Sequence, residues 1–128
     1  GQKLTMLNND GILHNIHLQG KGKGNEINIA QPKFRKQLPV PLGDTEVGVK
    51  IMCDAHSWMG GWISILPHPY YAITNEKGEY KIENVPPGTY KLVYWHEYCG
   101  TNEKEPASVT VAAGGTVAQN LTLKKAAK

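Results

Sequence analysis

The sequence predicts an all-β protein, and two observations support this prediction. No segment repeats apolar residues at helical spacing over three turns. In addition, 14 glycines and 8 prolines interrupt the 128 residues every few positions, and short runs of β-branched and aromatic residues lie between them. Many short strands at this spacing are typical of a β-sandwich or a pair of sandwiches.

Ten strands are expected, each a short apolar, β-branched or aromatic run bounded by turn residues. In the first half of the chain they are 3–7, 12–18, 25–30, 47–53 and 62–66. In the second half they are 70–74, 78–85, 88–95, 107–111 and 116–123. Apolar and polar residues alternate most plainly in YKLVYW and QNLTL, which indicates one face in a core and one in water.

The segments between the expected strands carry turn signals. Residues 20–24, GKGKG, are expected to form a flexible turn, because they lack the strand–loop–helix context of a phosphate loop. Within residues 74–92 we expect a hairpin with a glycine turn, and then Pro-Pro-Gly (86–88) leading into the next strand. Pro67 and Pro69 cannot donate to a strand ladder, so we expect two halves, residues 1–66 and 67–128.

Bulk properties narrow the functional classes. The net charge of +3 is spread over scattered lysines without interleaved aromatic residues, so nucleic-acid binding is not expected, whereas an acidic protein partner would suit the surface. No apolar run approaches the roughly 20 residues of a membrane helix, so no membrane span is expected. No Ser-His-Asp order or carboxylate pair stands out, and the candidate metal ligands described next would leave no open coordination position, so the protein is not expected to be an enzyme. The chain is expected to begin inside a longer precursor, after a signal peptide.

Chemistry is concentrated in residues 53–59, CDAHSWM, where Cys53, His56 and Met59 are each separated by two residues. A thiolate, an imidazole and a thioether suit copper better than calcium, magnesium or zinc, and copper commonly takes two histidines with one cysteine. The second histidine must come from elsewhere. His14 and His17 lie three apart on one expected strand and therefore face opposite ways, so only one of them is expected to be a ligand.

His14-Asn15 on a strand, followed by Cys-x-x-His-x-x-Met, resembles the cupredoxins, the small blue-copper proteins. The resemblance covers roughly residues 1–66. It implies a Greek-key sandwich with one copper ion held by His14, Cys53, His56 and Met59, and with Asn15 tying the two ligand loops together beside the sulfur. Only thirteen residues precede His14, fewer than is usual in that family, so we expect either that N-terminal strands are missing or that a first strand is supplied in another way.

The sequence beyond the loop, from ITNEKGEYKIENVPPGTYKL onward, resembles the carboxypeptidase regulatory-like (transthyretin-like) β-sandwich. This resemblance implies a small binding or structural module in residues 67–128.

Together the two resemblances imply a periplasmic or extracellular electron-transfer protein, or the copper subunit of a larger redox assembly. Its partner would be a redox protein such as a c-type cytochrome. Two alternatives stay open. One is a structural or adhesive β-module without functional metal, in which Cys53 forms a disulfide with Cys99; the other is copper storage or delivery. A second metal site that uses His17, His68 or His96 is not expected.

Overall fold

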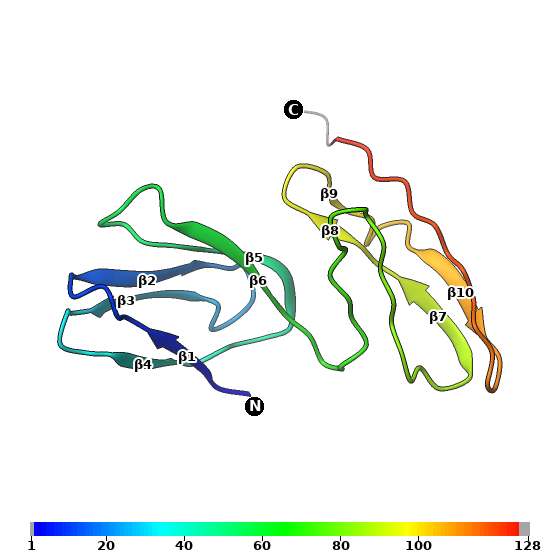
Figure 1. The fold of residues 1–128 in the computed structure, drawn as a ribbon, viewed down its shortest axis with the longest axis horizontal. Helices are drawn as coiled ribbons and strands as arrows, with labels where there is room; N and C mark the ends of the chain where they lie inside the picture. The colour runs from blue at the N-terminus through cyan, green and yellow to red at the C-terminus, as the bar shows by residue number, and fades with distance from the viewer. Residues whose placement is uncertain (1, 126–128) are drawn as a thin grey trace. The chain divides into compact units, whose positions relative to one another are not determined.

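Antiparallel β-strands make up all the regular structure in the computed structural model, which describes residues 2–125 and has no helix in that range (Figure 1). The prediction of an all-β protein is therefore confirmed. The chain divides into two compact units, Gly1–Pro67 and His68–Lys128, referred to below as unit 1 and unit 2.

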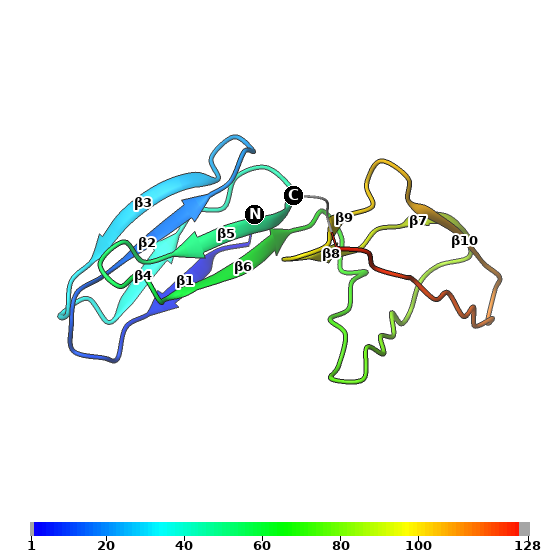
Figure 2. The same cartoon turned by 90° about the horizontal axis from the view of Figure 1, so that it is seen from above.

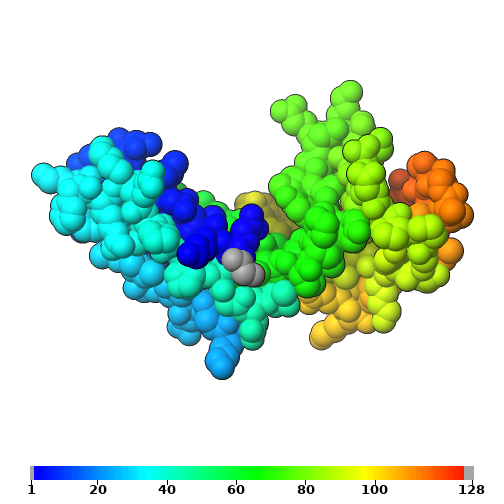
Figure 3. All heavy atoms as spheres, turned by 90° about the horizontal axis from the view of Figure 1, so that it is seen from below, coloured from blue at the N-terminus to red at the C-terminus, as the bar shows by residue number. Residues whose placement is uncertain are grey.

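Unit 1 contains two sheets that lie face to face. The larger sheet has four strands in the order β3 (Glu26–Gln31), β2 (His14–Gln19), β5 (Glu46–Met52) and β6 (Gly60–Ile65). The smaller sheet pairs β1 (Leu4–Leu7) with β4 (Gln37–Val40). Figures 1 and 2 show β1 and β4 as a second layer against the four-stranded sheet. Figure 3 looks onto this layer, with the blue residues of β1 beside the cyan residues of β4.

The core of unit 1 lies between these two layers and consists of aliphatic side chains from three strands. They are Ile16 and Leu18 of β2, Leu38 and Val40 of β4, and Val49 of β5. Leu18 is fully buried, with 0% of its surface exposed, and burial of one such side chain stabilises the fold by about 1.5–3 kcal/mol. Along β2 the inward positions alternate with outward ones, because successive residues of a strand face opposite sides.

A β-bulge sets the phase of β5. Opposite β6 the register shifts between Glu46 and Val49, and Gly48 between them has a φ of 75°. A positive φ of this size is strained for residues other than glycine. After the bulge, Val49 is buried and Ile51 packs against the core, so the inward phase runs on to Cys53.

Three loops gather at one end of unit 1, called here the loop end: residues 8–13, 32–36 and 53–59 (Figures 1 and 2). Two buried amides hold the first two loops in place. Asn8 Nδ2 donates to the Ile12 carbonyl over 2.8 Å. Gln31 Nε2 donates to the carbonyls of Met6 and Arg35 over 3.2 and 3.1 Å. These bonds satisfy amides that burial would otherwise leave unpaired.

The opposite end of unit 1 is fixed by Glu46 and Asn25. The Glu46 carboxylate accepts hydrogen bonds from the backbone N–H groups of Lys21 and Gly22 and from Asn25 Nδ2, all within 2.9 Å. These bonds, led by the one from Lys21, hold the pKa of Glu46 below its ordinary value. Residues 20–24 therefore form an anchored turn rather than the expected flexible one.

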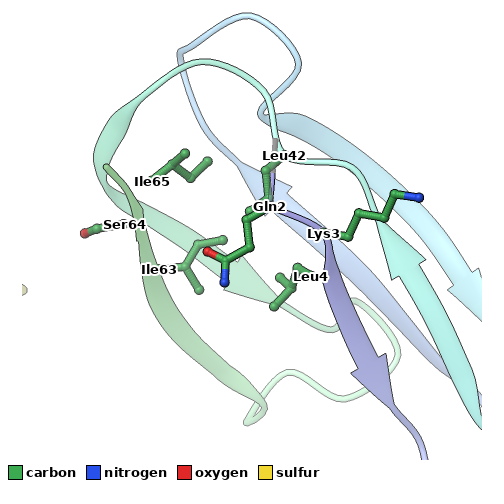
Figure 4. Close-up of a pocket in the computed structure, with 7 residues that line it drawn as sticks. All are labelled: Gln2, Lys3, Leu4, Leu42, Ile63, Ser64 and Ile65. Atoms are coloured by element: carbon green, nitrogen blue, oxygen red, sulfur yellow. The ribbon is translucent and has the colours of Figure 1, made fainter. Parts of the chain in front are cut away.

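A shallow pocket opens between β1 and β6, and Figure 4 shows Leu4, Leu42 and Ile63 around it while Ser64 points away. None of the four predicted ligands lines it. The pocket therefore lies beside β6, the edge strand of the larger sheet.

Unit 2 has less regular structure. Strand β7 (Gly88–Leu92) pairs with β10 (Ala107–Val111), and β8 (Trp95–His96) pairs with β9 (Gly100–Thr101). Asn102 links the two pairs, since its side chain accepts from the Tyr94 N–H and donates to the Leu92 carbonyl. No residue in the described part of unit 2 is buried.

Three of the ten strand predictions are wrong: residues 70–74, 78–85 and 116–123 form no ladder. The expected turn is present, with Gly78 at a φ of 77° and its N–H bonded to the Asn75 carbonyl, but no strands flank it. Conversely, β4 and β9 were not predicted, and the single strand expected over 88–95 is divided into β7 and the first residue of β8. Strand β4 was missed because Pro39 lies within it. Proline is tolerated there because β4 pairs with β1 alone, so not every backbone N–H of β4 has to donate to a neighbouring strand.

Candidate metal centre

The three strongest ligand candidates come from two elements at the loop end. His14 is the first residue of β2 and shares the inward face of Ile16 and Leu18. Cys53 directly follows β5 on the inward phase, and His56 lies in the 53–59 loop. That loop is closed by two backbone bonds, from Cys53 N–H to the Met59 carbonyl over 3.2 Å and from Met59 N–H to the His56 carbonyl over 3.0 Å.

The ligand atoms of these side chains form a small triangle. Cys53 Sγ lies 3.8 Å from His14 Nδ1 and 3.5 Å from His56 Nδ1, and the two Nδ1 atoms are 3.1 Å apart. A point equidistant from the three atoms lies about 2.0 Å from each of them, close to metal–nitrogen bonds of about 2.0–2.1 Å and metal–sulfur bonds of about 2.3 Å. His14, Cys53 and His56 can therefore hold one metal ion.

The chemistry of the three donor atoms limits which metal ions could bind here. Two imidazole nitrogens and a thiol sulfur this close together repel one another unless a proton or a cation lies between them. Hard cations prefer oxygen ligands, whereas Zn²⁺ and copper accept this combination. Cys53 and His14 are almost entirely covered, with 4% and 6% of their surfaces exposed, so solvent has little access to the triangle.

The environment of Cys53 favours the thiolate that a metal requires. Burial by itself raises the pKa of the Cys53 thiol, but hydrogen bonds from the Asn15 N–H, His14 and His56 outweigh it and lower the pKa from 9.0 to about 6. The Asn15 N–H lies 3.5 Å from the sulfur.

His14 responds in the opposite direction. Its hydrogen bond to Cys53 and a second one to Asp10 both raise the pKa of His14, against a smaller opposing effect of burial. Without metal, the site therefore favours a thiolate beside an imidazolium.

Asn15 joins the segments that carry His14 and Cys53. Its Oδ1 accepts hydrogen bonds from the N–H groups of Asp54 and Ala55 over 2.6 and 3.3 Å, and lies 3.3 Å from Cys53 Sγ. The 53–59 loop is thus fastened to β2 next to the sulfur.

A polar network on the outer face of the sheet adds a second fastening, which the sequence did not reveal. Asp54 accepts hydrogen bonds from Asn15 and Asn28, and its other oxygen lies 2.9 Å from His17 Nδ1. The bond to His17, followed by that to Asn28, lowers the pKa of Asp54. His17 therefore faces away from the triangle and anchors the loop, which agrees with the expectation that only one histidine of β2 points toward the thiol.

Met59 and Trp58 lie at the exposed end of the same loop. The Met59 main chain closes the loop, and its role as a fourth ligand stays a prediction. Trp58 is 80% exposed, and its ring lies 5.2 Å from that of His56, centre to centre.

The remaining candidates do not join the triangle. Both Cys53 and Cys99 are free cysteines, so the disulfide alternative is not seen. His68 Nδ1 accepts from the Tyr70 N–H and His96 Nδ1 from the Tyr98 N–H. Across residues 2–125, the triangle is the one group of three or more histidine, cysteine or acidic side chains found close enough to share an ion. No helix of the described chain is long and apolar enough to cross a membrane.

Comparison with known proteins finds a family match in the second part of the chain. Residues 63–124 match the family model of the carboxypeptidase regulatory-like domain, a β-sandwich, and the match begins within β6 of unit 1. No curated protein and no solved structure is detectably similar to the chain. The family match leaves residues 1–62 uncovered, so the likeness of unit 1 to cupredoxins depends on its own residues and geometry.

Proposed function

We propose that the protein is a one-electron carrier with a single type 1 copper site, acting in the periplasm or outside the cell, alone or as a subunit of a larger redox assembly. One observation carries this proposal: two imidazole nitrogens and a thiol sulfur surround a point about 2.0 Å from each, which matches the two-histidine, one-cysteine plane of blue-copper sites. His14, Cys53 and His56 would hold the ion, and Met59 would supply a thioether sulfur as a fourth ligand.

A bound copper ion would supply a centre that gains and loses one electron, and the contribution of the chain is to keep the ligands still. The Cys53 backbone is bonded to Met59, and its sulfur accepts the Asn15 N–H. Asn15 and Asp54 fasten the loop to β2 from the other side. Ligands held in this way move little when the charge of the site changes, which favours fast electron transfer.

The two imidazoles differ in their access to a partner. His14 is buried, whereas His56 is partly exposed and lies against the open ring of Trp58. We therefore assign the electron path to the His56 side. Six large apolar side chains are exposed at the loop end or immediately before it: Leu7, Ile12, Leu13, Phe34, Trp58 and Met59.

Charges around this apolar surface favour an acidic partner. Lys33, Arg35 and Lys36 are exposed on either side of Phe34 in the 32–36 loop. Opposite charges steer encounter and mainly raise the association rate. A c-type cytochrome or a redox complex with an acidic rim around an apolar contact surface would fit this surface.

The test is optical. Copper(II)-loaded, oxidised protein should show an intense visible band from thiolate-to-copper charge transfer, and Cys53→Ser should abolish it. Cys99→Ser is the matched control and should leave the band unchanged. A protein that stays colourless after copper loading would refute the type 1 assignment.

The same sample separates the two alternative functions. Copper storage or delivery predicts rapid loss of metal to a mild chelator, whereas burial of Cys53 and His14 favours slow loss. A structural or adhesive role is supported by the carboxypeptidase regulatory-like match, and it predicts that no copper is taken up at stoichiometric concentrations.

A further inference from the structure

Asp10 makes a contact at the edge of the metal centre that the sequence did not point to. Its Oδ2 lies 2.8 Å from His14 Nε2, the ring nitrogen turned away from Cys53 and His56. The Asp10 side chain is 61% exposed, whereas that of His14 is 7% exposed. His14 is therefore placed between a carboxylate in solvent and the ligand triangle in the interior.

Hydrogen bonds within the 8–13 loop hold Asp10 in this position. The buried Asn8 side chain accepts the Asp10 N–H over 3.1 Å and donates to the Ile12 carbonyl over 2.8 Å. Between these two anchors, Gly11 turns the chain with a φ of 71°, a backbone conformation suited to glycine. The carboxylate thus comes from a braced turn rather than from a free side chain.

The contact determines which nitrogen of His14 is available to a metal. An ionised carboxylate can only accept hydrogen bonds, so His14 Nε2 must carry the proton that is donated to Asp10. In the neutral ring the lone pair is then on Nδ1, which is the atom 3.8 Å from Cys53 Sγ and 3.1 Å from His56 Nδ1. A hydrogen-bonded carboxylate also makes the imidazole a stronger donor to a cation.

We infer that Asp10 is a positioning residue of the metal centre, which fixes His14 as the Nε2–H tautomer with Nδ1 turned to the ion and stabilises the more highly charged state of that ion. This inference rests on the proposed metal site but not on its blue colour. Asp10 touches His14 and not the ion, so its effect passes through the imidazole and through its own charge.

The experiment compares three variants of the full chain. Asp10→Ala removes both the hydrogen bond and the charge, and Asp10→Asn keeps an acceptor but removes the charge. Asp44→Asn is the matched control, because it removes one exposed carboxylate at the opposite end of unit 1. Thermal unfolding of each metal-free variant shows that it is folded. Affinities for Zn²⁺ and Cu²⁺ are measured by chelator competition, the His14 tautomer of the zinc form by ¹⁵N NMR, and the copper reduction potential by voltammetry.

For Asp10→Ala we expect affinity for both ions to fall about 10- to 100-fold, with mixed His14 tautomers in the zinc form. Asp10→Asn should recover part of the affinity and the single tautomer, yet raise the reduction potential, because the lost negative charge no longer favours Cu²⁺ over Cu⁺. Asp44→Asn should match the wild type.

Unchanged affinity and tautomer in Asp10→Ala would overturn the inference, as would an equal effect of Asp44→Asn. Zinc affinity that depends on Asp10 in a protein without a blue band would uphold the inference while refuting type 1 copper. A wild-type chain that binds neither ion would refute both.

Discussion

Unit 1 and unit 2 are built from the same kind of short antiparallel strands, yet they differ in what they bury. Unit 1 encloses Ile16, Leu18 and Val49 between two layers, and its candidate metal centre extends that inward face to His14 and Cys53. In the described part of unit 2, no side chain is buried. The comparison shows that the clustered side chains of His14 and Cys53 lie on strands with a core beneath them, whereas the strands of unit 2 pair without enclosing a side chain among the described residues.

Truncation of an apolar side chain should produce the largest difference in stability between the two units. Leu18→Ala should lower the free energy of unfolding of unit 1 by about 2–5 kcal/mol, because it leaves a cavity in an enclosed core. Leu92→Ala in β7 removes the same atoms from a half-buried site and should cost clearly less. Hydrogen exchange read by mass spectrometry follows the β2 and β7 amides separately. Equal losses of protection would show that unit 2 has a core comparable to that of unit 1.

The second-largest effect should come from the lowered pKa of the Cys53 thiol. A pKa of about 6 leaves this thiol roughly nine-tenths ionised at pH 7, against roughly a hundredth at the ordinary value of 9.0. The ultraviolet absorbance of the thiolate in metal-free protein should therefore rise with a midpoint near pH 6 and vanish in Cys53→Ser. A midpoint near 9 would mean that the bonds from Asn15, His14 and His56 do not form.

The ionisations of Cys53 and His14 should change the stability in opposite directions as the pH rises. Cys53 has a lowered folded pKa, so its contribution is complete above 9.0 and is lost as the pH falls through about 6. His14 has a raised folded pKa, so its contribution is complete below 6.5 and is lost as the pH rises through the folded value. Since the two contributions change in opposite directions, a titration of absorbance is the more direct measurement.

The smallest expected effect tests what holds unit 2 together. The Tyr80 hydroxyl donates to the Gln119 carbonyl, joining two segments that form no ladder. Tyr80→Phe should lower the free energy of unfolding of unit 2 by about 0.5–1.5 kcal/mol and leave unit 1 unchanged. Tyr71→Phe, which alters an exposed tyrosine of the same unit, is the control. A shift in the exchange of β2 amides would contradict the assignment of this bond to unit 2 alone.

Local patterns predicted much of the strand content, because alternation in a strand is a property of neighbouring residues. They failed where a partner decides the outcome. Residues 116–123 alternate well but have no ladder, and residues 37–40 contain Pro39 yet pair along β1. Whether an extended segment becomes a strand depends on a second segment far away in the chain, and periodicity carries no information about it.

The same distinction between local patterns and long-range contacts applies to the candidate site. The spacing of Cys53, His56 and Met59 is local, and so is the rule that His14 and His17 face opposite sides of a strand. The sequence by itself therefore determined an all-β chain, the ligand types on offer and the choice between the two histidines. Only the tertiary structure decided that His14 Nδ1 lies within 3.8 Å of the Cys53 sulfur, and that Asp10 and Asp54 brace the two segments from opposite sides. The reason is physical: the pairing of β2 with β5 and the bulge at Gly48 fix which residues meet, and both arise from contacts between residues distant in sequence.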